Sequence, residues 1–324
     1  MKAIKFRFLA LCLAALGAGC AFAQAWPPAT VRIVVPYPPG TEPDVLARDL
    51  GNALARQTGK VFVVDNKPGA NSIIGTEVVA KSEGDGATLL MVDRLAIVTN
   101  PQLYSKMPYK WEETLKPVSD LAGVHLFLGV REGLPVKTFA EFIAYARANP
   151  KKVNVGTGGN GHVTHIGMEM LAQAHGVSFT YVPYKGVAPG IAGLVGGEVD
   201  AMMSGGLVMQ PHARSGKVKA LVLGHTARAN FLPDVPTLAE AGGKAGSIPS
   251  TVFALFTSAK VPDAVLAQMN RAVVTAMSSP ELRANYAARG LEVGTTRPEE
   301  TLALMKREAA AYEKIIRDAG IKIE

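Results

Sequence analysis

Two proline-rich or glycine-rich loops of this sequence carry residue types that suit the binding of a small anion. The first loop follows the β-branched run 31–35 and leads into an amphipathic segment that begins near Val45. Backbone N–H groups in the first turn of a helix have no partner inside the helix, and together with the helix dipole they attract anions. The Thr41-x-x-Asp44 spacing also matches a capping box. The candidate ligand-binding residues of this loop are Tyr37, Pro39, Gly40, Thr41 and Asp44.

The second loop connects the predicted strand 153–156 to the predicted helix 163–175. Its glycines can adopt positive φ and let backbone amides converge on an oxyanion. Its candidate ligand-binding residues are Thr157, Gly158, Asn160, His162, Thr164 and His165. The segment 156–161 also fits G-x-G-x-x-G, but the strand that follows ends without the acidic residue that a dinucleotide ribose requires, and the motif lies in the middle of the chain.

Polar residues also follow two other predicted strands. Asp93 and Arg94 come after the buried run 89–92, where side chains commonly reach a cleft. Arg94 would hold a ligand carboxylate in a bidentate fork, or the pair would form a salt bridge that finishes the strand. Tyr184, after the predicted strand 179–182, could form the wall of a pocket.

Signatures of common enzymes are absent from the sequence. There is no G-x-S-x-G nucleophile motif and no H-E-x-x-H zinc motif, and the glycine-rich loop continues with His162 rather than with the lysine of a phosphate-binding loop. His162 and His165 could share a metal ion, but a third ligand is not evident. We therefore expect no catalytic residues, no metal and no cofactor. The alternative is an exported hydrolase or oxidoreductase that uses His162 or His165 as a base.

Residues 1–23 read as a signal peptide. A positively charged start precedes the short apolar run 8–16, and Ala21-Phe22-Ala23 is a cleavage site of the Ala-x-Ala type. A lipid anchor on Cys20 is the competing interpretation. Cleavage after Ala23 would remove Cys12 and Cys20 and leave a periplasmic protein with neither a disulfide nor a thiol ligand.

Strand-like and helix-like segments alternate along the chain, which favours an α/β architecture with largely parallel sheets. About 300 residues usually need two hydrophobic cores. We expect lobe 1 to comprise residues 24–123 and 253–324, and lobe 2 residues 124–252. The basic residues are scattered along a chain whose net charge is +7, which argues against nucleic-acid binding.

Several ordered motifs resemble one family. Val-Val-Pro-Tyr-Pro-Pro-Gly stands at 34–40, and Val-Pro-Tyr-Lys-Gly at 182–186. Further matching segments are 64–71, 84–90, 100–104, 158–161, 197–200 and 232–237. Together they resemble the Bug family, the periplasmic receptors of tripartite tricarboxylate transporters.

The resemblance implies a two-lobed periplasmic-binding-protein fold of type II, with two mixed, mostly parallel sheets and a ligand cleft between them. It implies that backbone amides and water of the loops 37–44 and 156–165 grip a small carboxylate, an organic or amino acid. Lobe closure would then be recognised by the transporter's membrane components, and the receptor would act as a monomer. A receptor that signals to a sensor kinase is the alternative partner.

The sequence departs from the family at positions that bear on ligand identity. Thr41, Glu42 and Pro43 stand where Gly-Ala-Thr is usual, and His162 replaces a small hydroxyl residue. The strand after Asp200 ends with Ser204 where an acidic residue is common, so Ser204 joins the candidate ligand-binding residues. We expect Arg94 and His162 to select an acid with a second polar end. The acidic side chains of Glu42 and Asp93 are also compatible with a ligand that carries an amine.

Overall fold

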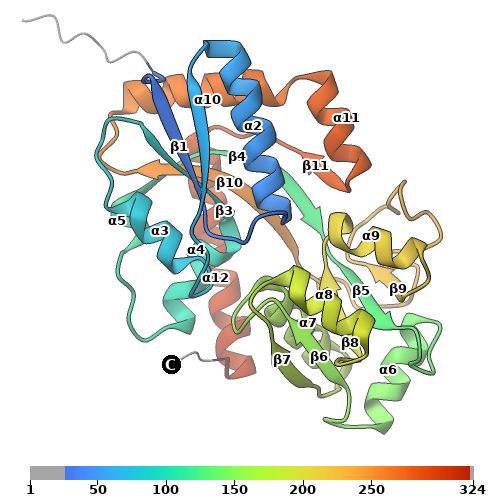
Figure 1. The fold of residues 1–324 in the computed structure, drawn as a ribbon. Coiled ribbons are helices and arrows are strands. Elements are labelled where there is room, and N and C mark those ends of the chain that lie inside the picture. The colour runs from blue at the N-terminus through green and yellow to red at the C-terminus, as the bar shows by residue number, and fades with distance from the viewer. Residues whose placement is uncertain (1–25, 322–324) are drawn as a thin grey trace, which may run out of the picture.

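The computed structural model describes residues 26–321, which form two β-sheets flanked by helices (Figure 1). The first sheet has the strand order β11-β4-β10-β3-β1-β2. Its strands are β1 (Thr30–Val35), β2 (Val61–Asn66), β3 (Thr88–Asp93), β4 (Leu115–His125), β10 (Ser250–Ser258) and β11 (Leu291–Val293). The helices beside it are α2 (Glu42–Thr58), α3 (Ile73–Ala80), α4 (Arg94–Leu103), α5 (Trp111–Thr114), α10 (Asp263–Met277), α11 (Pro280–Ala288) and α12 (Pro298–Ala319).

The second sheet has the order β7-β6-β8-β5-β9 and lies wholly within the middle of the chain. Its strands are β5 (Phe127–Arg131), β6 (Asn154–Thr157), β7 (Thr180–Pro183), β8 (Ala201–Ser204) and β9 (Val218–Leu223). Its helices are α6 (Phe139–Ala148), α7 (Val163–His175), α8 (Val187–Gly196) and α9 (Gly206–Arg214).

The prediction of an α/β fold with two mixed sheets is confirmed, but the sheets are less parallel than expected. The pairs β1–β2, β1–β3, β6–β7 and β6–β8 are parallel, whereas the other pairs are antiparallel. The difference has a topological cause. Strand β10 returns from the second sheet and inserts antiparallel between β3 and β4, and β5 runs antiparallel to both of its neighbours.

The chain passes between the sheets twice. It leaves the first sheet where β4 ends at His125 and returns at Ser250, where β10 begins, and these two residues are paired across the strands. The lobe boundaries expected between 123 and 124 and between 252 and 253 therefore lie near these paired ends of β4 and β10. The division into lobes at those positions stays a prediction.

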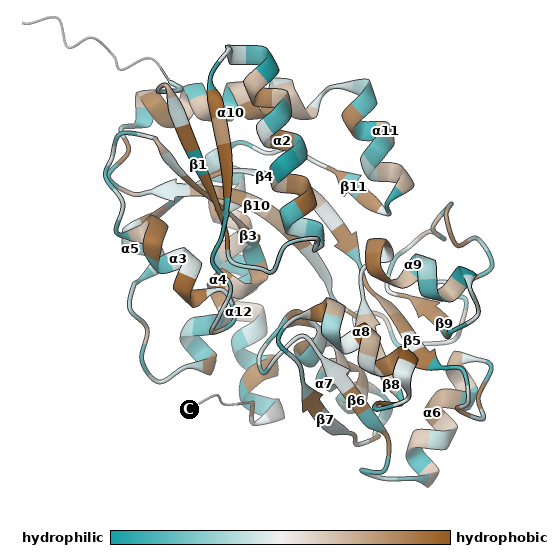
Figure 2. Ribbon diagram, in the orientation of Figure 1, coloured by the Kyte–Doolittle hydropathy of each residue, from teal (hydrophilic) through white to brown (hydrophobic). Residues whose placement is uncertain are grey.

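Apolar residues lie along the strands of both sheets and on the inner sides of the helices (Figure 2). One core packs α2, α10 and α11 against the first sheet, and another packs α8 and α9 against the second. A third continues from the opposite face of the first sheet into the second sheet, with Leu90, Leu128 and Phe142 among its members. Helix α12 contacts both α4 and α7, so it supports elements beside both sheets.

The sequence also has capping-box spacings at Thr237-x-x-Glu240 and Thr296-x-x-Glu299, each of which predicts a helix start, and both differ in the structure. Thr237 and Glu240 exchange the two hydrogen bonds of a capping box, but the chain continues as turns. The box expected at Thr296 does not form, because Thr296 Oγ1 accepts a hydrogen bond from Asp120 N. Glu300 Oε2 instead accepts the backbone N–H of Arg297, the residue that precedes α12. The predicted signal peptide and its cleavage site lie outside the described residues. None of the helices between residues 26 and 321 combines the length and the apolar character needed to cross a bilayer.

Candidate functional site

A cavity of about 680 Å³ lies between the two sheets, at the loops that follow their strands. Residues of both sheets' loops line it, from the segments 36–43, 68–72, 158–164 and 183–187, with Asp93 from the end of β3. Such a volume suits a small organic ligand. Of the sequence-predicted site residues, the lining contains Tyr37, Thr41, Asp93, Gly158, Asn160, His162, Thr164 and Tyr184.

The first loop is held rigid by Asp44, which lies behind it. Asp44 Oδ2 accepts a hydrogen bond from Gly40 N at 2.9 Å, and Oδ1 accepts one from Asn66 Nδ2 at 2.9 Å. Burial opposes ionisation of Asp44, but bonds from Arg48, Gly40 and Asn66 outweigh it and lower its pKa. Asp44 therefore positions the loop as an anion and does not reach the cavity.

The capping box expected at Thr41 does not form. The Thr41 hydroxyl donates to Pro38 O at 2.8 Å, and the side chain makes no cap to the helix. In addition, the backbone N–H groups of Thr41 and Glu42 have no acceptor among residues 26–321. Both residues line the cavity, so the start of α2 offers two backbone donors to a ligand. Pro39 and Gly40 lie outside the lining.

A second stretch of the first sheet's loops was missed by the sequence reasoning. Ala70, Asn71 and Ser72 all have positive φ, at 45°, 47° and 74°, which is uncommon outside glycine. Ser72 lines the cavity, and its Oγ is buried without a hydrogen-bond partner. Asn71 Nδ2 donates to Gly161 O at 3.1 Å, which ties this loop to the glycine-rich loop across the cavity. The sequence signals available were the Pro68-Gly69 turn and the family-like segment 64–71.

Most backbone N–H groups of the glycine-rich loop already donate hydrogen bonds within the protein. Gly158 N donates to Thr164 Oγ1 at 2.9 Å, and Gly161 N donates to His165 Nδ1 at 3.1 Å. The prediction that these glycine amides converge on a ligand is therefore wrong, because side chains of α7 already accept their hydrogen bonds. The N–H groups of Asn160 and Val163 have no acceptor among the described residues, and both residues line the cavity.

His162 lines the cavity as a neutral donor. Its Nδ1 accepts the Thr164 N–H at 3.2 Å, so the ring proton is on Nε2. Burial, and next the neighbouring His165, lower the pKa of His162 to about 4. His165 lies outside the lining, and burial lowers its pKa to about 4 as well.

Two carboxyl groups face the cavity. Burial raises the pKa of Glu42 to about 7, against the opposing effect of the Leu207 backbone N–H. Burial also raises the pKa of Asp93 to about 6, although Leu95 N donates to its Oδ1 at 2.9 Å. Among the described residues, no arginine lines the cavity, and Lys185 is its only lysine.

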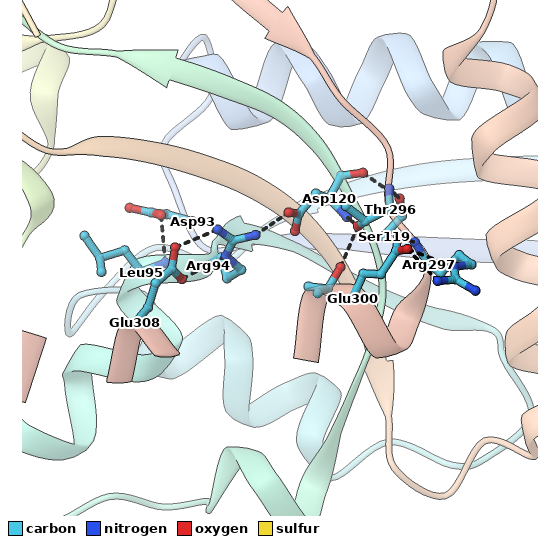
Figure 3. A network of polar contacts seen from close by, with 10 residues as sticks. Asp93, Arg94, Leu95, Ser119, Asp120, Thr296, Arg297, Glu300 and Glu308 are labelled. Carbon is cyan, nitrogen blue, oxygen red and sulfur yellow. Dashed lines mark hydrogen bonds and ion pairs between the residues drawn. The ribbon is translucent and has the colours of Figure 1, made fainter. Parts of the chain in front are cut away.

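Arg94 lies outside the cavity, in a buried ion-pair network (Figure 3). Its guanidinium pairs with Asp120, and its Nε and Nη2 donate to the two oxygens of Glu308 at 2.9 and 2.6 Å. Of the two interpretations of Arg94, the structure favours the salt bridge, because a guanidinium paired on both sides cannot also hold a ligand carboxylate. Thr157 and Ser204 are also buried outside the lining.

We expect Arg94→Met to destabilise the fold by about 3–5 kcal/mol, because it leaves Asp120 buried without its cation. The affinity of the folded variant for ligand should stay within about twofold of wild type. Chemical denaturation and titration calorimetry measure the two quantities. The double variant Arg94→Met/Asp120→Asn should recover part of the lost stability. If Arg94→Met instead lost ligand affinity while its stability was unchanged, Arg94 would be a ligand-binding residue.

Comparison with known proteins identifies relatives over most of the chain. A family model described as "Tripartite tricarboxylate transporter family receptor" matches residues 46–321. Protein BugT of Bordetella pertussis is 31% identical over 303 residues, which cover 93% of this chain and 93% of BugT.

Solved structures agree with the family match. Rpa4515 of R. palustris, solved with adipate, superposes with a TM-score of 0.86 at 30% identity and covers 92% of this chain and 99% of its own. MatC (Rpa3494) from Rhodopseudomonas palustris, solved with bound malate, has a TM-score of 0.81 at 30% identity and covers 90% of this chain and 100% of its own.

Proposed function

This chain belongs to the tripartite tricarboxylate transporter receptor family, whose members are solute-binding receptors with the periplasmic-binding-protein fold, and we propose that it captures a small carboxylate by closure of two lobes. We take the lobes to be residues 24–123 with 253–324, and residues 124–252. The mature receptor would start at Gln24 in the periplasm and act as a monomer that delivers its ligand to the transporter's membrane components. A sensor kinase is the alternative recipient.

One observation carries this proposal: loops of both sheets leave backbone N–H groups without acceptors around one cavity. Thr41 and Glu42 supply them at the start of α2, and Asn160 and Val163 at the start of α7. Donors on opposite walls suit an acid that is held from both sides, because closing the lobes completes its coordination. The hydrogen bond from Asn71 to Gly161 already joins these walls.

The polar groups support binding rather than catalysis. A base at the cavity surface would need a free ring nitrogen, but His162 uses Nδ1 to cap α7 and carries its proton on Nε2. A pKa of about 4 also makes this ring a weak base. The Nε2–H of His162 and the Oγ of Ser72 instead add side-chain hydrogen-bonding groups for the ligand's second polar end.

Mature protein from Gln24 should be stabilised against thermal unfolding by a small carboxylate and not by its amide. A ligand that binds only the folded state adds about 2.7 kcal/mol at a hundredfold excess over its dissociation constant. Adipate and malate are the first acids to measure, because they are the ligands of the two solved relatives. An equal response to adipate and adipamide would contradict a carboxylate receptor.

Carboxylate affinity should rise as the pH falls from 8 to 6. At pH 8 Glu42 is ionised and repels an anion, whereas near pH 6 it is mostly protonated, since burial has raised its pKa to about 7. The gain cannot exceed about tenfold per pH unit for each proton taken up. Glu42→Gln should raise affinity at pH 8 and weaken the pH dependence, with Asp93 responsible for the remainder.

Titration calorimetry at pH 6, 7 and 8 measures this dependence, with Glu112→Gln as an exposed control away from the cavity. A fall in affinity on acidification would contradict the prediction. It would indicate instead that the ligand carries an ammonium group beside Glu42.

A further inference from the structure

We propose that His125, His225 and Glu292 form a binding site for a divalent transition-metal ion, with zinc the best match, at the junction of the two sheets. The three side chains each offer one ligand atom, and these atoms lie within 4.8 Å of one another. His125 Nε2 is 3.0 Å from Glu292 Oε2, and His225 Nε2 is 3.7 Å from the same oxygen. Ligands of a tetrahedral zinc ion lie about 3.4 Å apart, given metal–ligand bonds of about 2.1 Å, and both nitrogen–oxygen distances are near this spacing. The two rings are stacked at an interplanar angle of 28°, so they must rotate apart for both Nε2 lone pairs to point at one ion.

The topology brings these residues together from distant parts of the chain. His125 ends β4, and Glu292 lies in β11, which pairs with β4. His225 follows β9, a strand of the second sheet. The sequence alone gives no sign of this cluster, because its three residues share no local motif.

Both rings direct Nε2 toward the same carboxylate. The Nδ1 of His225 lies 3.0 Å from Ala227 O and 3.3 Å from Ala227 N. Metal binding at Nε2 requires the tautomer in which Nδ1–H donates to the carbonyl oxygen of Ala227. The Nδ1 of His125 is buried and has no hydrogen-bond partner among the described residues, so this ring's polar contact is made through Nε2.

The two imidazole rings lie against one another beside the carboxylate. Their centroids are 3.7 Å apart in a stacked arrangement, while Glu292 supplies one negative charge. A single divalent ion bound to both nitrogens and the carboxylate oxygen satisfies all three ligands at once. Two nitrogen ligands favour zinc or a similar transition metal over magnesium or calcium, which prefer oxygen ligands.

A separate cavity of about 430 Å³ lies beside the cluster and leaves room for water at a fourth coordination position. Arg228 and Arg283 also line it, but Arg228 is paired with Glu240, at 2.9 Å between Nε and Oε2. This cavity shares no lining residue with the cavity proposed for the carboxylate. The metal site is therefore independent of the proposed function.

The test is titration of tag-free mature protein with Zn²⁺ in a buffer without chelators. We expect one ion per chain, with affinity at least tenfold weaker in His225→Ala and in Glu292→Gln. His212→Ala, which removes a histidine of α9 outside the cluster, should bind as wild type does.

A second readout separates ligation from folding. The Glu292 side chain is 67% exposed, so Glu292→Gln should unfold at the same temperature as wild type without metal. Zn²⁺ should then raise the unfolding temperature of wild type more than that of the variant, and Co²⁺ should give the intense visible absorption of a four-coordinate site. The proposal would be overturned if Zn²⁺ did not bind, if His225→Ala and Glu292→Gln bound Zn²⁺ as tightly as wild type, or if Co²⁺ gave the weak spectrum of a six-coordinate site.

Discussion

The supply of backbone N–H donors at two helix starts is the constraint on which the rest of this site depends. A loop that binds an anion through amides must first satisfy its own polar groups, and only the remaining donors can serve a ligand. Asp44 accepts Gly40 N in the first loop, and Thr164 and His165 accept the amides of Gly158 and Gly161 in the second. The same side chains that make the loops rigid therefore reduce the free donors to a few defined positions.

The charges around the cavity follow from this arrangement. Uncharged amides can hold a carboxylate without the desolvation cost of a buried cation, and no arginine lines the cavity within the described part of the chain. The nearest buried arginine, Arg94, is instead neutralised by Asp120 and Glu308. Burial raises the pKa values of Glu42 and Asp93. These carboxyl groups can therefore take up a proton when an anionic ligand binds.

Much of the fold could be predicted from the sequence. The sequence pattern predicts a strand at 31–35 and a helix at 298–319, and the structure has both at nearly these bounds. Hydrophobic periodicity and helix-start residues act locally, so they can be read from the sequence. Helix α4, Arg94–Leu103, was missed because it contains Pro101 and follows a strand without a break. The antiparallel insertion of β10 was missed because strand order depends on contacts between residues far apart in the chain.

The candidate site shows the same limit. Tyr37, Thr41 and His162 were found because each stands at the junction of a strand-like and a helix-like segment. Ser72 was missed, since its role depends on three successive positive φ angles that the residue types do not favour. Asp44 and His165 were expected to touch the ligand, but their side chains accept loop amides, and no sequence pattern distinguishes a residue that binds a ligand from one that holds the loop.

The central claim is that free backbone amides at the helix starts hold the ligand carboxylate, and Val163 allows it to be tested at a single N–H group. Val163 is the first residue of α7, and the preceding residue, His162, has an extended backbone that is compatible with a following proline. Val163→Pro therefore removes this N–H with little strain, while Val163→Ala shortens the side chain and keeps it. The measurement is calorimetric titration of both variants with the acid that stabilises wild type most. We predict at least a tenfold loss of affinity in Val163→Pro relative to Val163→Ala, as expected for a hydrogen bond to a charged group worth about 1.5–3 kcal/mol. Equal affinity in the two variants would contradict the account.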